Sequence, residues 1–340
     1  MAEPDSKPPR RKRLLQNLGL SVGTFLACVA LLEGVLRLCG YGNLEIYEPD
    51  PGLYWKLKPN QDCYTKIDHK PVHINSLGTR GPEFTPAKPA GVERVLSLGD
   101  SRTFGWGLTD AETYSRSLER LQAEKQTATI QVINAGVNAW SYPQMGKYFR
   151  DTALAYHPDV VILGEANLWT QFSETNDPAF VKKFMWRVRL KNFLRRFAIY
   201  HYIVEAKLKD FYERHRSKFI PVDPAQDPLF KEQQKKDPGE LFRKSIEALC
   251  DVAASNQVKV ILLYLPTLDD LSATNTALPL QVKRDVSESR HVPLVDLSPE
   301  IRAGGGKALY LDADPVHFNA RGNALIAQRL ADTMNSIAPR

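Results

Sequence analysis

Five short apolar runs alternate with amphipathic stretches after residue 93, and this alternation restricts the possible folds more than any other feature. The runs have no polar face, as expected for strands buried on both sides. Buried strands joined by helices form a parallel sheet with right-handed crossovers. The sequence predicts a three-layer α/β fold with strands at 94–99, 129–134, 159–164, 258–265 and 292–297, and helices near 111–125, 142–156, 239–256, 279–290 and 319–335.

A second signal stands near the amino terminus, where residues 14–32 carry no charge. As a helix this stretch would reach roughly 28 Å, close to the ~30 Å hydrocarbon core of a membrane. The cluster Arg10–Arg13 precedes it, which places the tail in the cytoplasm by the positive-inside rule. We expect a cytoplasmic basic tail at 1–13 and a transmembrane signal anchor at 14–38, with a cleaved signal peptide as the alternative.

The net charge of +6 is unevenly distributed. Residues 1–13 hold five Lys and Arg against two acidic residues, and residues 182–218 hold twelve against three, so the remainder is acidic. This pattern argues against a nucleic-acid partner and fits contact with a membrane surface. The 182–218 segment is also aromatic at helical intervals, so it either lies on anionic lipid headgroups or packs its aromatic side chains on the main domain.

Composition supports an ordinary globular body, with 43% apolar and 25% charged residues. Residues 39–91 are rich in Pro, Gly and Asn and are predicted to form a linker and small cover, ahead of a main domain at 92–338 with a helical insertion at about 168–237. The four cysteines lack zinc-binding spacing, so no metal site is expected. Cys63 and Cys250 would both lie outside the membrane, and the sequence leaves their pairing open.

Reactive side chains follow the predicted strands. Ser101 stands on a Gly-Asp-Ser turn after the first strand, and Asp314 precedes His317 by three residues near the carboxyl terminus. A serine hydroxyl becomes a strong nucleophile when a histidine accepts its proton and a carboxylate orients that histidine. Ligands bind at the carboxyl ends of parallel strands, so these residues are predicted to meet there as a catalytic triad.

An acyl-transfer site also needs hydrogen-bond donors for the tetrahedral oxyanion. The predicted donors are the backbone N–H groups of Ser101 and Gly136 and the side-chain amide of Asn167. Each motif alone is a common turn or cap. Their joint occurrence, in order, at successive strand ends favours the catalytic interpretation.

The sequence resembles the SGNH/GDSL hydrolase family over residues 92–338. The resemblance rests on LSLGDSRTFG with Ser101 at the nucleophile position, NAGVNAWS with Gly136, LGEANL with Asn167, and DADPVHFNARG with Asp314 and His317. The upstream segment INSLGTRGPEF is similar to that of membrane-anchored bacterial members. The resemblance implies a flavodoxin-like sheet and ester hydrolysis without a metal or cofactor.

Two positions depart from the family pattern. Arg102 follows the serine where a small or apolar residue is usual, which indicates either an anionic substrate or a side chain pointing to solvent. Leu168 follows Asn167 where the family has Asp; Asn176 and Asp177 offer the dipeptide nine residues too late. Trp106 is predicted either to wall the substrate pocket or to pack against the first helix.

These observations favour a single-pass membrane protein with a cytoplasmic amino terminus and a catalytic domain in the periplasm or outside the cell. The leading hypothesis is a serine esterase that removes short acyl groups, with acetylated envelope carbohydrate as the preferred substrate class. The alternatives are an O-acyltransferase to carbohydrate that uses the same triad and a non-catalytic scaffold of the same fold. The expected partners are an acyl ester and membrane lipid, contacted through the amino-terminal helix and the basic 182–218 segment.

Overall fold

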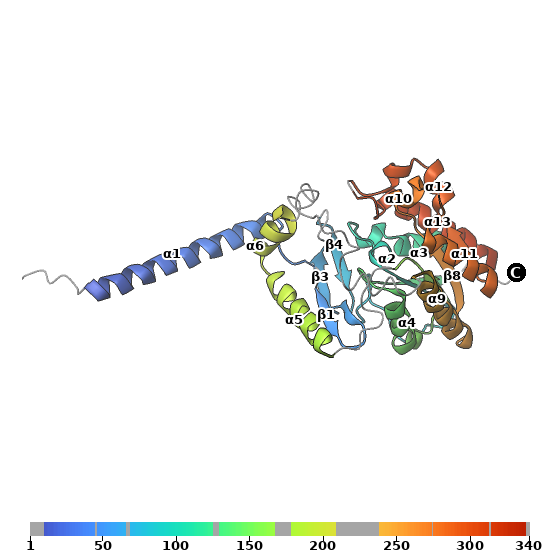
Figure 1. The fold of residues 1–340 in the computed structure, drawn as a ribbon, viewed down its shortest axis with the longest axis horizontal. Helices are drawn as coiled ribbons and strands as arrows, with labels where there is room; N and C mark the ends of the chain where they lie inside the picture. Colours follow the sequence, from blue (N-terminus) through green and yellow to red (C-terminus); the bar gives the residue numbers. More distant parts are fainter. Residues whose placement is uncertain are drawn as a thin grey trace, which may run out of the picture. The chain divides into compact units, whose positions relative to one another are not determined.

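The computed structural model describes residues 10–44, 46–65, 69–124, 129–166, 178–208, 238–273, 275–312 and 314–337 (Figure 1). The chain forms two compact units. The first contains residues 1–44 and 193–216, and the second contains residues 45–192 and 217–340.

The second unit is built on a five-stranded parallel sheet, as predicted. Its strands occur in the order β6-β5-β7-β8-β9. From β5 the chain first adds β6 on one side of the sheet and then adds β7, β8 and β9 on the other side. The direction of strand addition reverses between β5 and β7, so this is the topological switch point. Ligands bind at this point in doubly wound sheets. The strands are β5 (Val92–Gly99), β6 (Thr129–Gly136), β7 (Val160–Leu163), β8 (Lys259–Tyr264) and β9 (Leu294–Asp296).

Helices cover both faces of this sheet, which confirms the three-layer α/β prediction (Figure 1). Alternate strand residues point to opposite faces, so Leu96 and Leu98 belong to one buried cluster and Val95 to the other. The first cluster packs against α4 (Tyr142–Asp151), α9 (Pro238–Ser255) and α11 (Leu278–Arg290). The second packs against α3 (Tyr114–Glu124), α12 (Ser298–Ala303) and α13 (Ala320–Ile337).

The segment expected to be a linker and cover contains two antiparallel hairpins. They pair β1 (Tyr47–Asp50) with β2 (Tyr54–Leu57) and β3 (Gln61–Tyr64) with β4 (Pro71–Ile74). Side chains of both hairpins are buried in the same cluster as α4 and α9. A backbone bridge between Arg80 and Asn134 also joins this segment to the free edge of β6. The segment is therefore part of the folded unit.

The described chain also contains the helix α5 and several short helices and turns. They are α2 (Ser101–Phe104), α5 (Pro178–Leu194), α6 (Ala198–Tyr200), α10 (Leu268–Ser272), the 3₁₀ turns η1 (Asp110–Glu112), η2 (Ala153–Tyr156) and η6 (Gly306–Leu309), and the π-helix η4 (His201–Leu208). The predicted insertion at 168–237 thus contains α5, α6 and η4, while its residues 168–177 and 209–237 lie outside the described part of the chain. Cys63 and Cys250 are both buried, and they are not joined by a disulfide.

The first unit combines α1 (Arg10–Leu38) with α6 and η4. Among the described helices, α1 alone is long and apolar enough to cross a membrane, and its leucines other than Leu36 are exposed. Near its end, the Glu33 carboxylate accepts hydrogen bonds from the backbone N–H groups of Ala198 (2.9 Å) and Ile199 (3.0 Å). Arg37 donates to Glu33 and to the Arg196 carbonyl. The membrane-sized helix is thus tied to the start of α6.

Candidate active site

The turn that presents Ser101 connects β5 to α2. Asp100 caps this one-turn helix by accepting a hydrogen bond from the Arg102 N–H at 2.9 Å, and Gly105 ends it with a φ of 86°. The backbone is packed so closely here that a Cβ on Gly99 would lie 2.0 Å from the Thr103 Oγ1. A tight strand-to-helix turn holds the serine hydroxyl at the carboxyl edge of the sheet, beside the switch point.

His317 and Asp314 come from the loop that precedes α13. The Asp314 Oδ1 accepts from the backbone N–H groups of Val316 (2.8 Å) and His317 (3.1 Å), which fixes the carboxylate within its own loop. Its Oδ2 lies 2.7 Å from the His317 Nδ1, and the His317 Nε2 lies 2.7 Å from the Ser101 Oγ. The structure therefore brings the three predicted triad residues together in the order that proton transfer requires.

Electrostatics keep the Asp314 carboxylate ionised. Burial raises the pKa of Asp314, but the hydrogen bond and charge of His317, together with the two backbone donors, outweigh burial and hold the pKa below its usual value. An ionised carboxylate accepts the His317 Nδ1–H and leaves Nε2 as the basic nitrogen facing the serine. The arrangement can accept a proton from Ser101 and stabilise the imidazolium that results.

Arg102 does not point to solvent. Its side chain is 11% exposed, and its guanidinium donates to the Asp100 carboxylate at 2.8 Å and to the Leu265 carbonyl at 3.1 Å. Burial raises the pKa of Asp100, but the Arg102 charge and hydrogen bonds more than offset this and lower it. These Arg102 donors act inside the fold, where they compensate a buried carboxylate, and the predicted role of Arg102 in substrate binding stays a prediction.

Gly136, the predicted oxyanion donor, lies at the end of β6. Its N–H donates to the Asn134 Oδ1 at 3.0 Å, so an oxyanion would have to compete with this acceptor, and the predicted role stays a prediction. A Cβ at this position would lie 2.2 Å from the Phe104 N. Glycine here permits β6 to approach α2 directly. The Ser101 N–H, at the first position of α2, has no intrahelical acceptor and remains a candidate donor.

Asn167 and Leu168 lie outside the described residues, as do Asn176 and Asp177, so the predicted amide donor stays a prediction. The chain leading to Asn167 is described up to Ala166. Glu165 is buried there, and its Oε1 accepts from the Leu265 N–H at 3.1 Å and from the Lys283 Nζ at 2.5 Å. The strand end that leads to Asn167 is therefore anchored by a buried ion pair.

Lys283 is a site-supporting residue that the sequence analysis missed. Its side chain is fully buried, and Nζ also donates to the Leu263 carbonyl at 2.5 Å. Burial lowers the pKa of Lys283, and the Glu165 charge only partly opposes that effect. A signal was present, because Leu280, Lys283 and Val286 follow one another at three-residue spacing on the buried side of α11.

Trp106 lies next to the triad. Its ring centroid is 6.0 Å from that of His317, with the two planes tilted by 32°. Its backbone N–H donates to the Ser101 carbonyl at 3.1 Å. This placement fits the expectation that Trp106 forms a wall of the substrate site, and that role is tested below. Within the described ranges, no group of three His, Cys, Asp or Glu side chains is arranged to hold a metal ion.

The structure is similar to several solved esterases. The lipase/acylhydrolase from Enterococcus faecalis matches with 15% identity over 72% of this chain and 96% of that chain, at a TM-score of 0.46. The psychrotrophic esterase EstA from Pseudoalteromonas sp. matches with 13% identity over 72% and 97%, at 0.43. A two-domain esterase active on acetylated mannans matches with 14% identity over 73% and 50%, at 0.43.

A search of curated proteins returned no match. The sequence profile of the GDSL-like Lipase/Acylhydrolase family matches residues 97–325, which is more than half of the 340-residue chain. This range includes the nucleophile turn, the strand ends and the loop that carries the aspartate and histidine. The chain belongs to the GDSL-like lipase/acylhydrolase family and is a serine hydrolase acting on ester bonds.

Proposed function

We propose that this protein is a membrane-anchored esterase in which Ser101, His317 and Asp314 carry out the reaction. The observation that supports this proposal is the continuous hydrogen-bonded path from the Ser101 Oγ through both nitrogens of His317 to Asp314, at 2.7 Å for each step. Such a path couples nucleophilic attack to proton removal.

In the first half-reaction the Ser101 Oγ attacks the acyl carbonyl while His317 accepts its proton. The ester C–O bond then breaks, and His317 gives that proton to the departing alcohol. In the second half-reaction His317 takes a proton from water, the resulting hydroxide equivalent attacks the acyl-serine, and the proton returns to Ser101. The Ser101 N–H and the Asn167 amide are the proposed donors to the oxyanion, and each such donor is typically worth about 3 kcal/mol of barrier.

The proposed substrate is a short acyl ester, with acetylated carbohydrate of the cell envelope as the preferred class. Support comes from the proposed topology, because an enzyme tethered outside the cytoplasm meets such esters. Transfer of the acyl group to a sugar hydroxyl would use the same acyl-serine. Product analysis with an added sugar acceptor separates these reactions, because hydrolysis gives free acid and transfer gives an acylated sugar.

The anchor is α1, with residues 1–13 in the cytoplasm. Its exposed apolar side chains, its 29-residue length and the preceding basic cluster support this assignment. The adjoining part of the basic segment exposes apolar side chains together with Arg196 and Lys207, a combination suited to anionic headgroups. The exposed apolar residues are Phe193, Phe197, Ile203, Val204 and Leu208.

The first test is fluorophosphonate labelling of the detergent-solubilised full chain, followed by mass spectrometry of the modified peptide. We expect an adduct on Ser101 in the wild type and none in Ser101→Ala. His317→Ala should slow labelling by about 10³-fold or more, because the serine loses its base. Ser255→Ala, at an exposed serine of α9, is the control and should label normally. A folded wild type that is never labelled contradicts the proposal and favours the scaffold alternative.

A further inference from the structure

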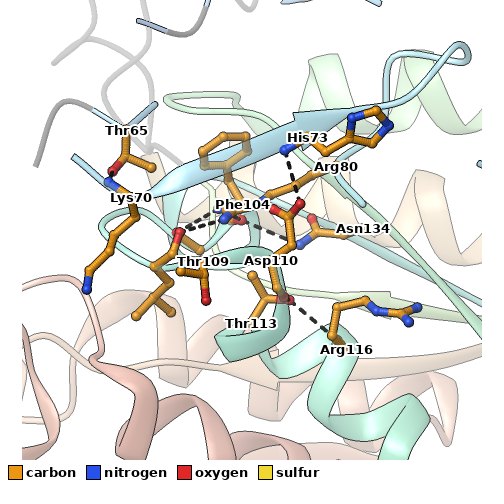
Figure 2. Close-up of polar contacts among 12 residues, drawn as sticks. Thr65, Lys70, His73, Arg80, Phe104, Thr109, Asp110, Thr113, Arg116 and Asn134 are labelled. Atoms are coloured by element: carbon orange, nitrogen blue, oxygen red, sulfur yellow. Dashed lines mark hydrogen bonds and ion pairs between the residues drawn. The ribbon is translucent and has the colours of Figure 1, made fainter. Parts of the chain in front are cut away.

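Arg80 belongs to the INSLGTRGPEF segment, whose contribution to the reaction is not explained by the triad. Its side chain is 1% exposed, and its Nε donates to the Asp110 Oδ1 at 2.7 Å (Figure 2). A buried arginine is costly unless every donor finds an acceptor. The positions of those acceptors therefore indicate what this residue holds in place.

The remaining guanidinium donors bind the loop that follows the nucleophile helix. Nη1 donates to the carbonyls of Phe104 (2.8 Å) and Gly105 (2.7 Å), and Nη2 donates to the carbonyl of Leu108 (2.6 Å). The guanidinium carbon also lies 4.7 Å from the centre of the Phe104 ring. One side chain thus satisfies three carbonyls of residues 104–108, hereafter the post-nucleophile loop.

This loop needs such a partner because α2 is only one turn long. Carbonyls at the end of a helix have no intrahelical donor, and leaving one buried and unpaired costs about 1–3 kcal/mol. Gly105 and Gly107 adopt φ values of 86° and 77°, which reverse the chain within a few residues. Without Arg80, the Leu108 carbonyl would lose its donor, whereas the Phe104 carbonyl would keep the Asn134 Nδ2 at 3.5 Å and the Gly105 carbonyl would keep the Leu108 N–H at 3.1 Å.

The same loop contacts the general base. Trp106 lies between the two glycines, with its ring 6.0 Å from the His317 ring. At Gly107 an added Cβ would lie 2.5 Å from a methyl carbon of Leu311, and the Leu311 N–H donates to the His317 carbonyl at 2.9 Å. The post-nucleophile loop therefore contacts the histidine side chain through Trp106 and the histidine backbone indirectly, through Leu311.

Arg80 is itself held on two sides. Its backbone N–H donates to the Asn134 carbonyl at 3.0 Å, at the edge of β6. The second oxygen of Asp110 accepts the His73 N–H at 3.0 Å, so the carboxylate that binds Arg80 is tied to β4 (Figure 2). The upstream segment thus holds the Arg80 guanidinium in place against the post-nucleophile loop.

We propose that Arg80 is a positioning residue for ester hydrolysis. By holding the post-nucleophile loop, it keeps Trp106 against His317 and so keeps the imidazole in line with the Ser101 hydroxyl. This inference rests on the proposed triad chemistry. Lysine cannot replace it, because an ammonium has three donors around one atom, whereas the planar guanidinium presents five donors in a fixed fork.

The test compares Arg80→Lys with Arg94→Lys in the full chain. Arg94 is a matched control, because it is also buried and donates to carbonyls of Thr85, Pro86 and Tyr156, but it lies near the opposite end of β5. Hydrolysis of p-nitrophenyl acetate is measured at a temperature where both variants are folded by circular dichroism. We expect Arg80→Lys to lower kcat by about 10- to 100-fold with little change in KM. Arg94→Lys should keep kcat even where its unfolding midpoint falls.

A double-mutant cycle tests the route through Trp106. If Arg80 acts by holding this ring, Arg80→Lys and Trp106→Ala combined should lower kcat no further than the worse single variant. Additive losses, or a wild-type kcat in folded Arg80→Lys, overturn the proposal. Asp110→Asn, which removes the charge but keeps an oxygen acceptor, is the second variant; it should lower kcat in the same direction, and an unchanged kcat there counts against the proposal.

A readout independent of activity separates this inference from the proposed function. The hydrogen-bonded Nδ1 proton of His317 is expected as a downfield proton resonance, identified by its absence in His317→Gln. Arg80→Lys should broaden or remove this resonance, and Arg94→Lys should retain it. An inactive wild type would refute the proposed function, whereas an unchanged resonance in Arg80→Lys would refute the positioning role.

Discussion

The Arg102 guanidinium and the Asp100 carboxylate form an ion pair next to Ser101 in the sequence, and both side chains are largely buried. Asp100 is 5% exposed, and the Arg102 guanidinium binds both the Asp100 carboxylate and the Leu265 carbonyl. Removing one member of a buried pair leaves the other uncompensated, which is more harmful than losing the attraction alone. The residue after the nucleophile is therefore coupled to fold stability.

We predict that Arg102→Met lowers the free energy of unfolding at pH 7 by about 3–5 kcal/mol. The lowered pKa of Asp100 means that its carboxylate stabilises the wild type at neutral pH, and this contribution is lost only as the pH falls below about 3.9. In the variant the pKa of Asp100 rises above its unfolded value, so the difference from wild type shrinks as the pH is lowered toward about 4.

Urea unfolding at pH 7 and pH 4 measures this effect. Arg150→Met, at an exposed residue of α4 paired with Asp151, is the control and should show no measurable loss at either pH. If Arg102 instead bound an anionic substrate, Arg102→Met would raise KM for an anionic ester and leave the unfolding midpoint unchanged.

The contact between β6 and α2 depends on a glycine at 136. We predict that Gly136→Ala lowers both stability and Ser101 labelling, because its Cβ would overlap the Phe104 amide and displace the nucleophile helix. Gly146→Ala is the matched control on α4, where a Cβ meets no atom within 4 Å. That variant should gain about 0.5–1 kcal/mol, since alanine favours a helix interior. Thermal unfolding and fluorophosphonate labelling report both effects.

Helix α11 is joined to the end of β7 by Lys283 and Glu165. We predict that Lys283→Met costs about 3–5 kcal/mol, because it leaves the Glu165 carboxylate buried without its cation. Adding Glu165→Gln should restore part of that loss, since a neutral amide can still accept from the Leu265 N–H. Denaturant unfolding of the two single variants and the double variant gives the coupling. Strictly additive losses would show that the pair is not coupled. Lys244→Met, at an exposed pair, should change nothing measurable.

The proposed membrane anchor and the triad belong to different compact units. Ser101, His317 and Asp314 all lie in the unit formed by residues 45–192 and 217–340, whereas α1 lies in the other. We predict that deleting residues 1–40 moves the protein from the carbonate-resistant membrane fraction to the soluble fraction while Ser101 is still labelled. Deleting residues 1–9 is the control, because it leaves Arg10–Arg13 and α1 intact, and should keep the chain in the membrane. A mature chain that begins after residue 38 would instead identify a cleaved signal peptide.

Much of this architecture followed from local pattern. Strands buried on both faces must be continuously apolar, so all five runs were recognisable, and each of the expected helices was found near its predicted position. The Asp314–His317 spacing was readable for the same reason, because the two residues are joined within a single loop by backbone hydrogen bonds. Strands, helices and contacts formed by residues close in the sequence can therefore be recognised from the local sequence.

The partners of the supporting charges could not be recognised in this way, even where the spacing of α11 indicated that Lys283 is buried. Lys283 meets Glu165 across 118 positions, and a charged residue in an amphipathic helix is most often solvated. Arg80 was hidden likewise in a segment that resembled a linker, because the carbonyls that it binds lie 24, 25 and 28 positions away.

The chain's order of apolar and polar residues was thus enough to specify a parallel α/β sheet, an apolar amino-terminal helix and the types of residue at the strand ends. Which donors stay free for chemistry, and which are used inside the fold, depended on how distant segments pack. Burial removes water as a competing partner, so each buried charge or N–H must bind the nearest available group. That group is set by the three-dimensional fold, as the 216 positions between Ser101 and His317 illustrate.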